Sequence, residues 1–404
     1  MGVTLNLDRL AAREGFAALI EALGGPNQTR LVGGVVRDTL LGLAPADVDL
    51  ATRLLPDDVL ARLKAADIRA VPTGIAHGTV TAVLPSGPIE VTTLRHDVST
   101  DGRHAVVAFT DAWDEDAARR DFTMNALYAD PVTGAVFDSV GGIADLEARV
   151  VRFIGDPYRR IAEDHLRILR FFRFHARFGD TPDAEGLAAC SARANDLMAL
   201  SRERIASELL KLLVAAQAVR VVTLMIDHGI FRAVLPEIVD ATPLAELAER
   251  EAAAGIAPDA IRRLATLIPP AAAESVGARL KLSNADRKRL CAAPQGPGDE
   301  GPRALAYRVG MASAIDRLLL SGEDVSALHE WTPPALPIGG GALVARGLSK
   351  GPQVAAVLRA IETRWIAEGF PPADRVDQIA DAAVKDALAA RIVESASTAS
   401  RGRA

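Results

Sequence analysis

Two aspartates that stand two residues apart, Asp47 and Asp49, fall in the short β-rich segment DVDLAT. Side chains two residues apart in a strand point to the same face, so a strand here would present both carboxylates together. Paired carboxylates suit Mg²⁺, which takes few protein ligands and completes its coordination with water and phosphate oxygens. The spacing indicates a metal site, although an isolated Asp-x-Asp is more often part of a turn or a helix cap.

A candidate phosphate cradle precedes the aspartates in LVGGVVRDTLLG. This pattern predicts a strand, a glycine turn and a helix start, where backbone N–H groups can bind phosphate. Gly33 and Gly34 would let a ligand approach the backbone, and Arg37 would offer its guanidinium to the same anion. No Gly-Lys-Ser/Thr sequence follows, which argues against a P-loop kinase or ATPase. The glycine pair, the helix start and the arginine each indicate little more than a tight turn when taken alone. Together they indicate a triphosphate site.

Two later segments carry further polar residues that could reach this site. Glu90 in IEVTTLR alternates with apolar residues, so it is either a third carboxylate from a neighbouring strand or an exposed strand residue. In ARRDFTMNAL, the group Arg119, Arg120 and Asp121 stands before an apolar run, and a surface ion pair is its simpler interpretation. The pattern alone leaves both alternatives open.

The elements that must position these residues alternate between short β-rich runs and short helices over residues 31–137. Strands are predicted at RLVG, DVDLAT, IRAVPT, GTVTAVL, IEVTTLR and MNALYAD, and helices at VVRDTLLG and PDDVLARLKAADI. The segment VLPSGPIEV predicts a hairpin, because Pro85, Gly87 and Pro88 supply its turn. An antiparallel or mixed sheet is therefore expected rather than a doubly wound parallel one.

Beyond residue 138 the sequence predicts helices. After the glycine-rich connector DSVGGIADLEARVVRFIGDP, one long amphipathic helix is expected from Pro157 to Gly179. Most of a cluster of eight arginines between residues 149 and 177 lies on it. Ala and Leu dominate the second half of the chain, which favours helix there. The expected fold is thus an α/β head followed by an all-α neck, body and tail.

The composition, with 49% hydrophobic and 24% charged residues among 404, is that of a globular protein. A formal net charge of −6 excludes a uniformly basic nucleic-acid-coating protein, but the arginine cluster allows local contact with RNA phosphates. Cys190 and Cys291 lie far apart and outside any zinc-type spacing, so free thiols in a reducing compartment are expected. Because no signal peptide or membrane-spanning run is found, we expect a cytoplasmic protein with no membrane contact and no evident protein partner.

Six segments in order resemble the successive motifs of the class II tRNA nucleotidyltransferase/poly(A) polymerase family, in the polymerase-β superfamily. They are GGVVRD with DVDLAT, GIAHGTVTAV, EVTTLR, RRDFTMNAL, DSVGGIADLEARVVR and EDHLRILRFFRF. The resemblance runs over residues 30–215, and the tail from LPIGGG to AEGF is also similar to the family. It implies a catalytic nucleotidyltransferase head over 1–140, a helical neck for nucleotide selection over 141–215, and a tRNA-binding body and tail over 216–404.

The resemblance also implies roles for individual residues. Asp47 and Asp49 would bind Mg²⁺, with Glu90 as a less secure third acidic position, so that two metal ions activate an RNA 3′ hydroxyl and stabilise the leaving pyrophosphate. Arg170 and Arg173 would contact nucleotide phosphates. Alternatively, their apolar stems would pack against neighbouring side chains while their guanidinium groups stay in water. The remaining nucleotide contacts would be Gly33, Gly34 and Arg37 at the triphosphate, and Arg120 and Asp121 at the sugar and phosphates.

The EDHLR segment bears on the choice of base. Asp164 and Arg167 are three residues apart and would be neighbours on one face of the expected helix. A carboxylate accepts and a guanidinium donates a hydrogen bond, which fits the amino donor and ring-nitrogen acceptor of both cytosine and adenine. Guanine and uracil present the donor and the acceptor in the opposite order. An ordinary ion pair is the simpler interpretation of any single Asp-x-x-Arg, but the family uses these matched positions to select C and A.

The function that the resemblance implies is the addition of CCA to the 3′ acceptor end of tRNA from CTP and ATP. Poly(A) polymerase and a catalytically silent RNA-binding homologue are the alternatives. The segment over residues 97–117 resembles the flexible loop associated with full CCA addition, and GIAHGTVTAV is more similar to CCA-adding members. His-Asp occurs only at His96-Asp97, so no phosphohydrolase activity of the His-Asp type is expected.

Overall fold

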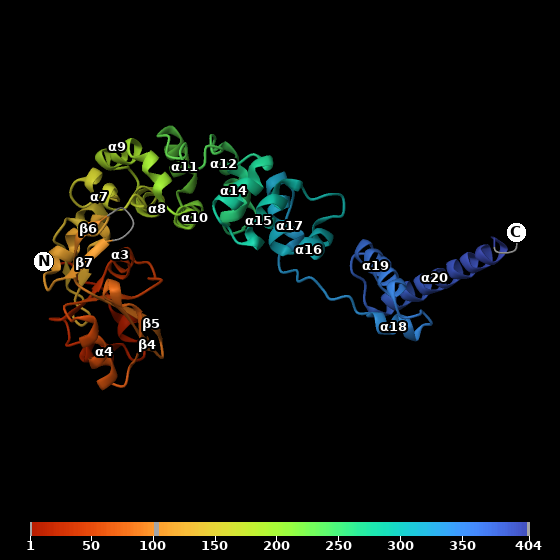
Figure 1. The fold of residues 1–404 in the computed structure, drawn as a ribbon, viewed down its shortest axis with the longest axis horizontal. Coiled ribbons are helices and arrows are strands. Elements are labelled where there is room, and N and C mark those ends of the chain that lie inside the picture. The colour runs from red at the N-terminus through yellow and green to blue at the C-terminus, as the bar shows by residue number, and fades with distance from the viewer. Residues whose placement is uncertain (1, 101–104, 402–404) are drawn as a thin grey trace. The chain divides into compact units, whose positions relative to one another are not determined.

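The computed structural model describes residues 2–100 and 105–401 of the chain. Two compact units are formed, one by residues 1–242 with 275–282 and the other by residues 243–274 with 283–404. All the candidate site residues belong to the first unit, whose strands and helices run from red to green in Figure 1. The finer division of the chain at residues 140 and 215 stays a prediction.

A seven-stranded sheet forms the framework of the site, with the strand order β3-β4-β5-β2-β1-β8-β9. β2 and β5 pair in parallel, whereas the other neighbouring strands pair antiparallel. The predicted mixed sheet is therefore confirmed, and β9 is a strand that was not predicted. The strand bounds are β1 Thr29–Val32, β2 Asp49–Thr52, β3 Arg69–Gly74, β4 Thr79–Leu84, β5 Gly87–Thr93, β8 Tyr128–Ala129 and β9 Val136–Phe137.

The predicted hairpin and the two predicted helices of the sheet region are present. β4 and β5 pair up to Leu84 and Gly87, and Gly87 has a φ of 110°, which a side-chain-bearing residue rarely adopts. Helix α3 (Gly34–Leu40) follows β1 directly. Helix α4 (Pro56–Ala65) begins with a proline, carries its acidic residues in the first turn and packs against β3 and β4.

The segment that resembles a flexible loop contains regular structure in its described part. Strands β6 (Arg95–Thr100) and β7 (Ala105–Phe109) pair antiparallel as a separate ribbon, and helix α5 (Trp113–Ala118) follows. The run AVVAF is apolar and β-branched, which favours a strand. Residues 101–104 lie outside the described residues.

The single long helix expected from Pro157 to Gly179 is wrong. The structure has α7 (Pro157–Glu163) and α8 (Arg167–Phe178), separated by Asp164, whose φ of −152° and ψ of 106° are those of extended backbone. Asp164 Oδ1 accepts a hydrogen bond from the Leu166 backbone N–H at 3.1 Å, which satisfies a backbone donor in the turn between the two helices. The apolar periodicity continues through the break and therefore concealed it.

Helix α8 is buried along most of its length and packs against α10 and α11. Phe171 and Phe172 are fully buried and Phe174 is 8% exposed, which confirms that these rings are core residues. The other helices of the first unit are α1 Asp8–Ala11, α2 Phe16–Ala22, α6 Gly142–Glu147, α9 Ala184–Ala192, α10 Arg202–Leu213 and α11 Ala218–Asp227, together with most of α14 Ala273–Arg279.

The second unit is helical, as predicted for the carboxyl-terminal half. A core around Trp365 includes the ring of Tyr307, 5.5 Å away between centroids, and that of Phe370 at 4.9 Å. No helix within the described residues is long and apolar enough to cross a membrane. The later helices are α12 Thr242–Ala253, α13 Ala260–Leu267, α14 Ala273–Arg279, α15 Asn284–Ala292, α16 Pro302–Val309, α17 Met311–Ser321, α18 Gly340–Ala345, α19 Pro352–Ala367 and α20 Ala373–Arg401.

Candidate active site

The acidic part of the site is built on the parallel pair of strands. Asp49 on β2 stands opposite Glu90 on β5, and residues paired in this way present their side chains on the same face of the sheet. Burial raises the pKa of Asp49 to about 6, with Glu90 and Asp47 acting in the same direction and Arg120 opposing them. The three predicted carboxylates therefore share one electrostatic environment.

Asp47 reaches this environment by a different route from the predicted one. β2 begins at Asp49, so Asp47 lies in a bend before the strand and is exposed. The alternation of side chains along a strand therefore does not apply to Asp47. Its proximity to Asp49 follows instead from the short connection between them, and it is seen in its effect on the pKa of Asp49.

The glycine turn between β1 and α3 lies between two guanidinium groups. Gly33 has a φ of 72°, which favours glycine, and a Cβ atom there would lie 3.5 Å from Arg120 Nη1. A Cβ atom on Gly34 would lie 3.7 Å from Arg37 Nη2. The two arginines predicted to contact phosphates thus flank the predicted phosphate cradle.

Arg37 is buried and is held by polar groups on two sides. Its Nε donates to Asp38 Oδ1 at 2.8 Å, and its Nη1 donates to Asn125 Oδ1 at 2.5 Å. The guanidinium also stacks over the ring of Phe178, 4.3 Å from its centroid. Burial lowers the pKa of Arg37, and the nearby Arg177 acts in the same direction.

Arg120 is oriented by a buried carboxylate that the sequence interpretation did not single out. Asp116, four residues earlier, accepts from Arg120 Nη2 at 3.0 Å, from Arg119 Nε at 2.8 Å and from the Tyr128 hydroxyl at 2.5 Å. Burial alone would raise the pKa of Asp116, but the two arginines and the tyrosine outweigh it and hold the pKa at about 2. The spacing of four residues is a helical ion-pair signal that could have identified Asp116.

Asp121 is buried and connects the site to helix α8. Its Oδ2 accepts from Arg170 Nε at 2.7 Å, and its Oδ1 accepts from Asn125 Nδ2 at 3.0 Å. Burial alone would raise the pKa of Asp121, but Arg170 and these hydrogen bonds hold it below its usual range. This arrangement is a buried network and not the surface ion pair considered as the simpler interpretation.

Asn125 is a second residue that the sequence interpretation missed. It ends the short 3-10 helix η2 (Thr123–Asn125), accepts from Arg37 and donates to Asp121. Its side chain therefore joins the glycine turn to the residues that hold Arg170. Asn125 belongs to the quoted segment RRDFTMNAL, but only the folded structure reveals these two partners.

Asp164 and Arg167 do not pair with each other in the structure. Asp164 Oδ2 accepts from Arg204 Nη2 at 2.7 Å, whereas Arg167 Nη1 donates to Glu163 Oε2 at 2.6 Å. The prediction that the two lie on one face of a continuous helix is wrong, because α7 and α8 are separate helices. The simpler interpretation of an ion pair between them does not hold either.

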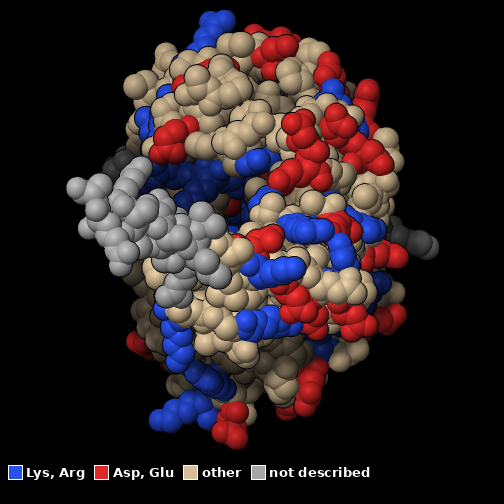
Figure 2. Space-filling model, turned by 90° about the vertical axis from the view of Figure 1, so that its right-hand side faces the viewer, with Lys and Arg blue, Asp and Glu red and all other residues tan. Residues whose placement is uncertain are grey.

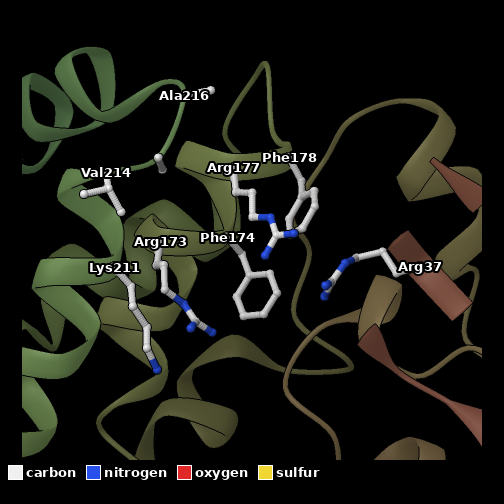
Figure 3. Close-up of a pocket in the computed structure, with 9 residues that line it drawn as sticks. Arg37, Arg173, Phe174, Arg177, Phe178, Lys211, Val214 and Ala216 are labelled. Carbon is white, nitrogen blue, oxygen red and sulfur yellow. The ribbon is translucent and has the colours of Figure 1, made fainter. Parts of the chain in front are cut away.

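The last two arginines of the predicted site both have carboxylate partners and aromatic neighbours. Arg170 pairs with Asp121, and Arg173 Nε lies 2.9 Å from Glu208 Oε2. Both guanidiniums lie over the ring of Phe174, at 5.3 Å and 4.6 Å from its centroid. Figure 3 shows the heads of Arg173 and Arg37 on opposite sides of this ring.

A mixed sheet with adjacent acidic strands, a glycine turn flanked by arginines and a helical neck defines the chain as a nucleotidyltransferase. Two family models match, the poly(A) polymerase head domain over residues 29–152 and the probable RNA and SrmB-binding site of polymerase A over residues 181–242. Mitochondrial CCA tRNA nucleotidyltransferase 1 of Mus musculus is 34% identical over 381 residues, covering 88% of this chain and 87% of the relative. The chain belongs to the tRNA nucleotidyltransferase/poly(A) polymerase family.

Two further relatives agree with this assignment. The CCA-adding enzyme of Levilactobacillus brevis is 41% identical over 203 residues, which is 50% of each chain. The crystal structure of the Bacillus stearothermophilus CCA-adding enzyme in complex with CTP is 26% identical, with a TM-score of 0.63 over 87% of this chain and 92% of that one. The similarity in sequence thus extends to the fold.

Enzymes of this family generally use divalent metal ions. Within the described residues, no group of three or more His, Cys, Asp or Glu side chains is arranged to hold a metal ion by itself. The carboxylates near Asp49 nevertheless have the right chemistry, since a cation would offset both the burial and the neighbouring negative charges that raise the pKa of Asp49. Substrate phosphate oxygens and water commonly supply the ligands that such a site lacks.

Proposed function

We propose that the chain adds CCA to the 3′ end of tRNA from CTP and ATP and releases pyrophosphate. The observation that carries the proposal is the convergence of Asp49 and Glu90, on paired strands, with a glycine turn flanked by Arg37 and Arg120. Nucleotidyl transfer needs both carboxylates for a metal ion and a cradle for a triphosphate. The relatives from mouse and Levilactobacillus brevis are named for CCA addition, which favours this activity over poly(A) synthesis.

In this proposal Asp47 and Asp49 hold Mg²⁺, and Glu90 completes the acidic face beside them. Mg²⁺ bound there would supply charge stabilisation at the reacting phosphate and acidify the attacking hydroxyl. Asp116 and Tyr128 keep Arg120 beside the glycine turn, where its guanidinium binds phosphate. Positioning and charge stabilisation, and not a covalent step on the protein, account for most of the catalysis.

Asp164 and Arg167 select the base in this proposal. Each is held by a partner in the structure, Asp164 by Arg204 and Arg167 by Glu163. A cytosine or adenine edge offers a donor to the carboxylate and an acceptor to the guanidinium, so a bound base replaces these partners. Guanine and uracil offer two mismatched groups and leave both side chains unsatisfied.

The remaining parts of the chain are assigned to tRNA. We propose that the helical part over residues 216–404 binds tRNA and that the arginines of the neck contact the phosphates of its acceptor end. Such contacts make binding sensitive to salt even though the net charge is −6. Both cysteines are free thiols, which supports the reducing cytoplasm as the location, although the mouse relative is named as mitochondrial.

One assay separates this function from its alternatives. The purified protein is incubated with Mg²⁺ and a tRNA that ends before CCA, and is given CTP, ATP, both, or GTP with UTP. Addition of two C residues and one A is expected, with no product when EDTA is present. Long A tails made without CTP would identify a poly(A) polymerase. No incorporation by the wild type, with tRNA binding retained, would identify a silent RNA-binding homologue.

A further inference from the structure

A pocket of about 510 Å³ beside the predicted site is lined almost entirely by basic and apolar side chains. Its basic residues are Arg37 from α3, Arg173 and Arg177 from α8, and Lys211 from α10. Figure 3 shows the rings of Phe174 and Phe178 between these cations. No carboxylate is among the described residues that line the pocket, whereas acidic and basic groups are interspersed on the face drawn in Figure 2.

The carboxylates near the pocket are too few to neutralise it. Arg37 and Arg177 share one carboxylate, that of Asp38, at 2.7 Å and 3.2 Å, and both stack over the ring of Phe178. Arg173 pairs with Glu208 at 2.9 Å. Within the described part of the chain, Lys211 has no carboxylate partner and is exposed. In the described ranges, the four cations therefore have direct ion pairs with only two carboxylates; a third, Asp121, acts on Arg37 and Arg173 but is itself paired with Arg170.

The cations also lower one another's pKa. Burial lowers the pKa of Arg173, and Arg170 and Arg37 act in the same direction. Arginine keeps its charge at neutral pH, so the shift reflects first the free-energy cost of burying the guanidinium and then its repulsion from the neighbouring cations, which Glu208 and Asp121 offset in part. A bound anion removes this cost. The apolar rings exclude water around the guanidiniums and strengthen their attraction for an anion.

We propose that Arg177 and Lys211 bind phosphate groups of a substrate in this pocket, in addition to the phosphate contacts assigned to Arg37 and Arg173. The inference rests on the proposed function. The bound chemistry is a phosphate, which belongs either to the RNA backbone or to the incoming triphosphate. The residues that line the pocket include Arg37 but none of Asp47, Asp49 or Glu90, so the phosphates bound here are distinct from the phosphate at which nucleotidyl transfer takes place.

Lys211→Gln is the most direct test, because Lys211 has no ion pair with any described residue whose loss would disturb the fold. Arg177→Gln and the double variant follow, and Lys211→Arg restores the charge. Lys64→Gln and Arg69→Gln remove one exposed charge each from the same unit outside the pocket and serve as matched controls. For each protein, kcat and the KM values for CTP and for tRNA lacking CCA are measured at several salt concentrations.

If the pocket binds RNA phosphates, Lys211→Gln raises the KM for tRNA about 3- to 10-fold and lowers the salt slope of binding by about one. If it binds the triphosphate, the KM for CTP rises instead. In both cases Lys211→Arg restores the wild-type value and the double variant shows the larger effect. Unchanged KM values for both substrates in the double variant, or a loss confined to kcat, would overturn the proposal.

A second measurement keeps the pocket testable if the proposed function fails. Equilibrium binding of the same tRNA and of inorganic pyrophosphate is measured without turnover in the wild type and the Lys211 and Arg177 variants. A wild type that adds no nucleotides, yet binds one of these probes through Lys211 and Arg177, would refute CCA addition and support the pocket. Binding of both probes that is indifferent to both residues would refute the pocket alone.

Discussion

Asp49 and Glu90 occupy directly opposed positions on the two parallel neighbours of an otherwise antiparallel sheet. Their carboxylates face the same side, and the pKa of Asp49 is raised to about 6 by burial first and by Glu90 next. A carboxylate whose pKa is higher in the folded than in the unfolded state destabilises the fold wherever it is ionised. The negative charge at this position therefore lowers the stability of the folded protein.

Asp49→Asn is expected to abolish activity and to stabilise the fold. In metal-free buffer at pH 7, its free energy of unfolding should exceed that of the wild type by about 1–3 kcal/mol, because the buried like-charge repulsion is removed. CCA addition should fall at least ~100-fold. Chemical denaturation and nucleotide incorporation are the measurements, and Glu21→Gln, an exposed carboxylate change in α2 (Phe16–Ala22), is the control. A less stable Asp49→Asn protein would contradict the conclusion that the charge of Asp49 destabilises the fold.

Asn125 is expected to be required for nucleotide binding, because its side chain links Arg37 to Asp121. Asn125→Ala leaves Arg37 Nη1 and Asp121 Oδ1 without this partner, which should raise the KM for CTP about tenfold and lower the free energy of unfolding by about 1–3 kcal/mol. Asn125→Asp should be worse, because an aspartate can accept from Arg37 but cannot donate to Asp121. Steady-state kinetics and denaturation test this order, with Asn27→Ala as a control. Equal effects of the two substitutions would show that the direction of these hydrogen bonds is unimportant.

His175 is expected to make the fold sensitive to acid. The side chain is fully buried, and its Nε2 lies 3.0 Å from Arg220 Nη1, so it must accept and be neutral. Burial, with Arg220 acting in the same direction, lowers the pKa of His175 from 6.5 to about 4. Between these values the unfolded chain binds a proton that the folded chain does not, so stability falls as the pH drops from about 6.5 towards 4.

The measurement is the free energy of unfolding as a function of pH. His175→Phe should be less stable at pH 7, because Arg220 loses its acceptor, but its stability should depend less on pH between about 6.5 and 4. His77→Gln, at an exposed position, should keep the wild-type pH dependence. A wild-type slope that persists in His175→Phe would assign the acid sensitivity to other groups.

The parts of the site that the sequence predicted are those set by local pattern. Alternating apolar residues indicated the strands that carry Asp49 and Glu90, and the glycine pair indicated the turn beside Arg37. Asn125 was missed because its role depends on Arg37, a partner brought close only by folding. Asp116 has a local partner in Arg120, four residues on, but its burial and its bond to Tyr128 also depend on the fold. The helix break at Asp164 was missed because the apolar periodicity continues through it, while the aspartate side chain bonds to the backbone two residues on.

The break has a consequence for base selection. Because Asp164 is an extended residue between α7 (Pro157–Glu163) and α8 (Arg167–Phe178), its carboxylate is held by the Leu166 N–H and by Arg204 instead of by a helical neighbour. In the proposed function, a base that binds Asp164 competes with Arg204 for the carboxylate, and a base that binds Arg167 competes with Glu163 for the guanidinium. If Asp164 and Arg167 select the base as proposed, selectivity depends on one base edge competing with these two ion pairs.

Asp164→Ala is therefore expected to relax the choice of base while sparing triphosphate binding. GTP and UTP should be incorporated measurably, because a carboxylate that rejects their hydrogen-bonding order is gone, and the loss of discrimination should be about 1–3 kcal/mol, or roughly 5- to 150-fold. Glu163→Gln is the control, since it removes the negative charge paired with Arg167 and keeps the acceptor at Asp164. Relative kcat/KM values for the four nucleotides, with inhibition by pyrophosphate to report the phosphate site, give the result. If Asp164→Ala discriminates against GTP and UTP as strongly as the wild type, the base must be recognised elsewhere.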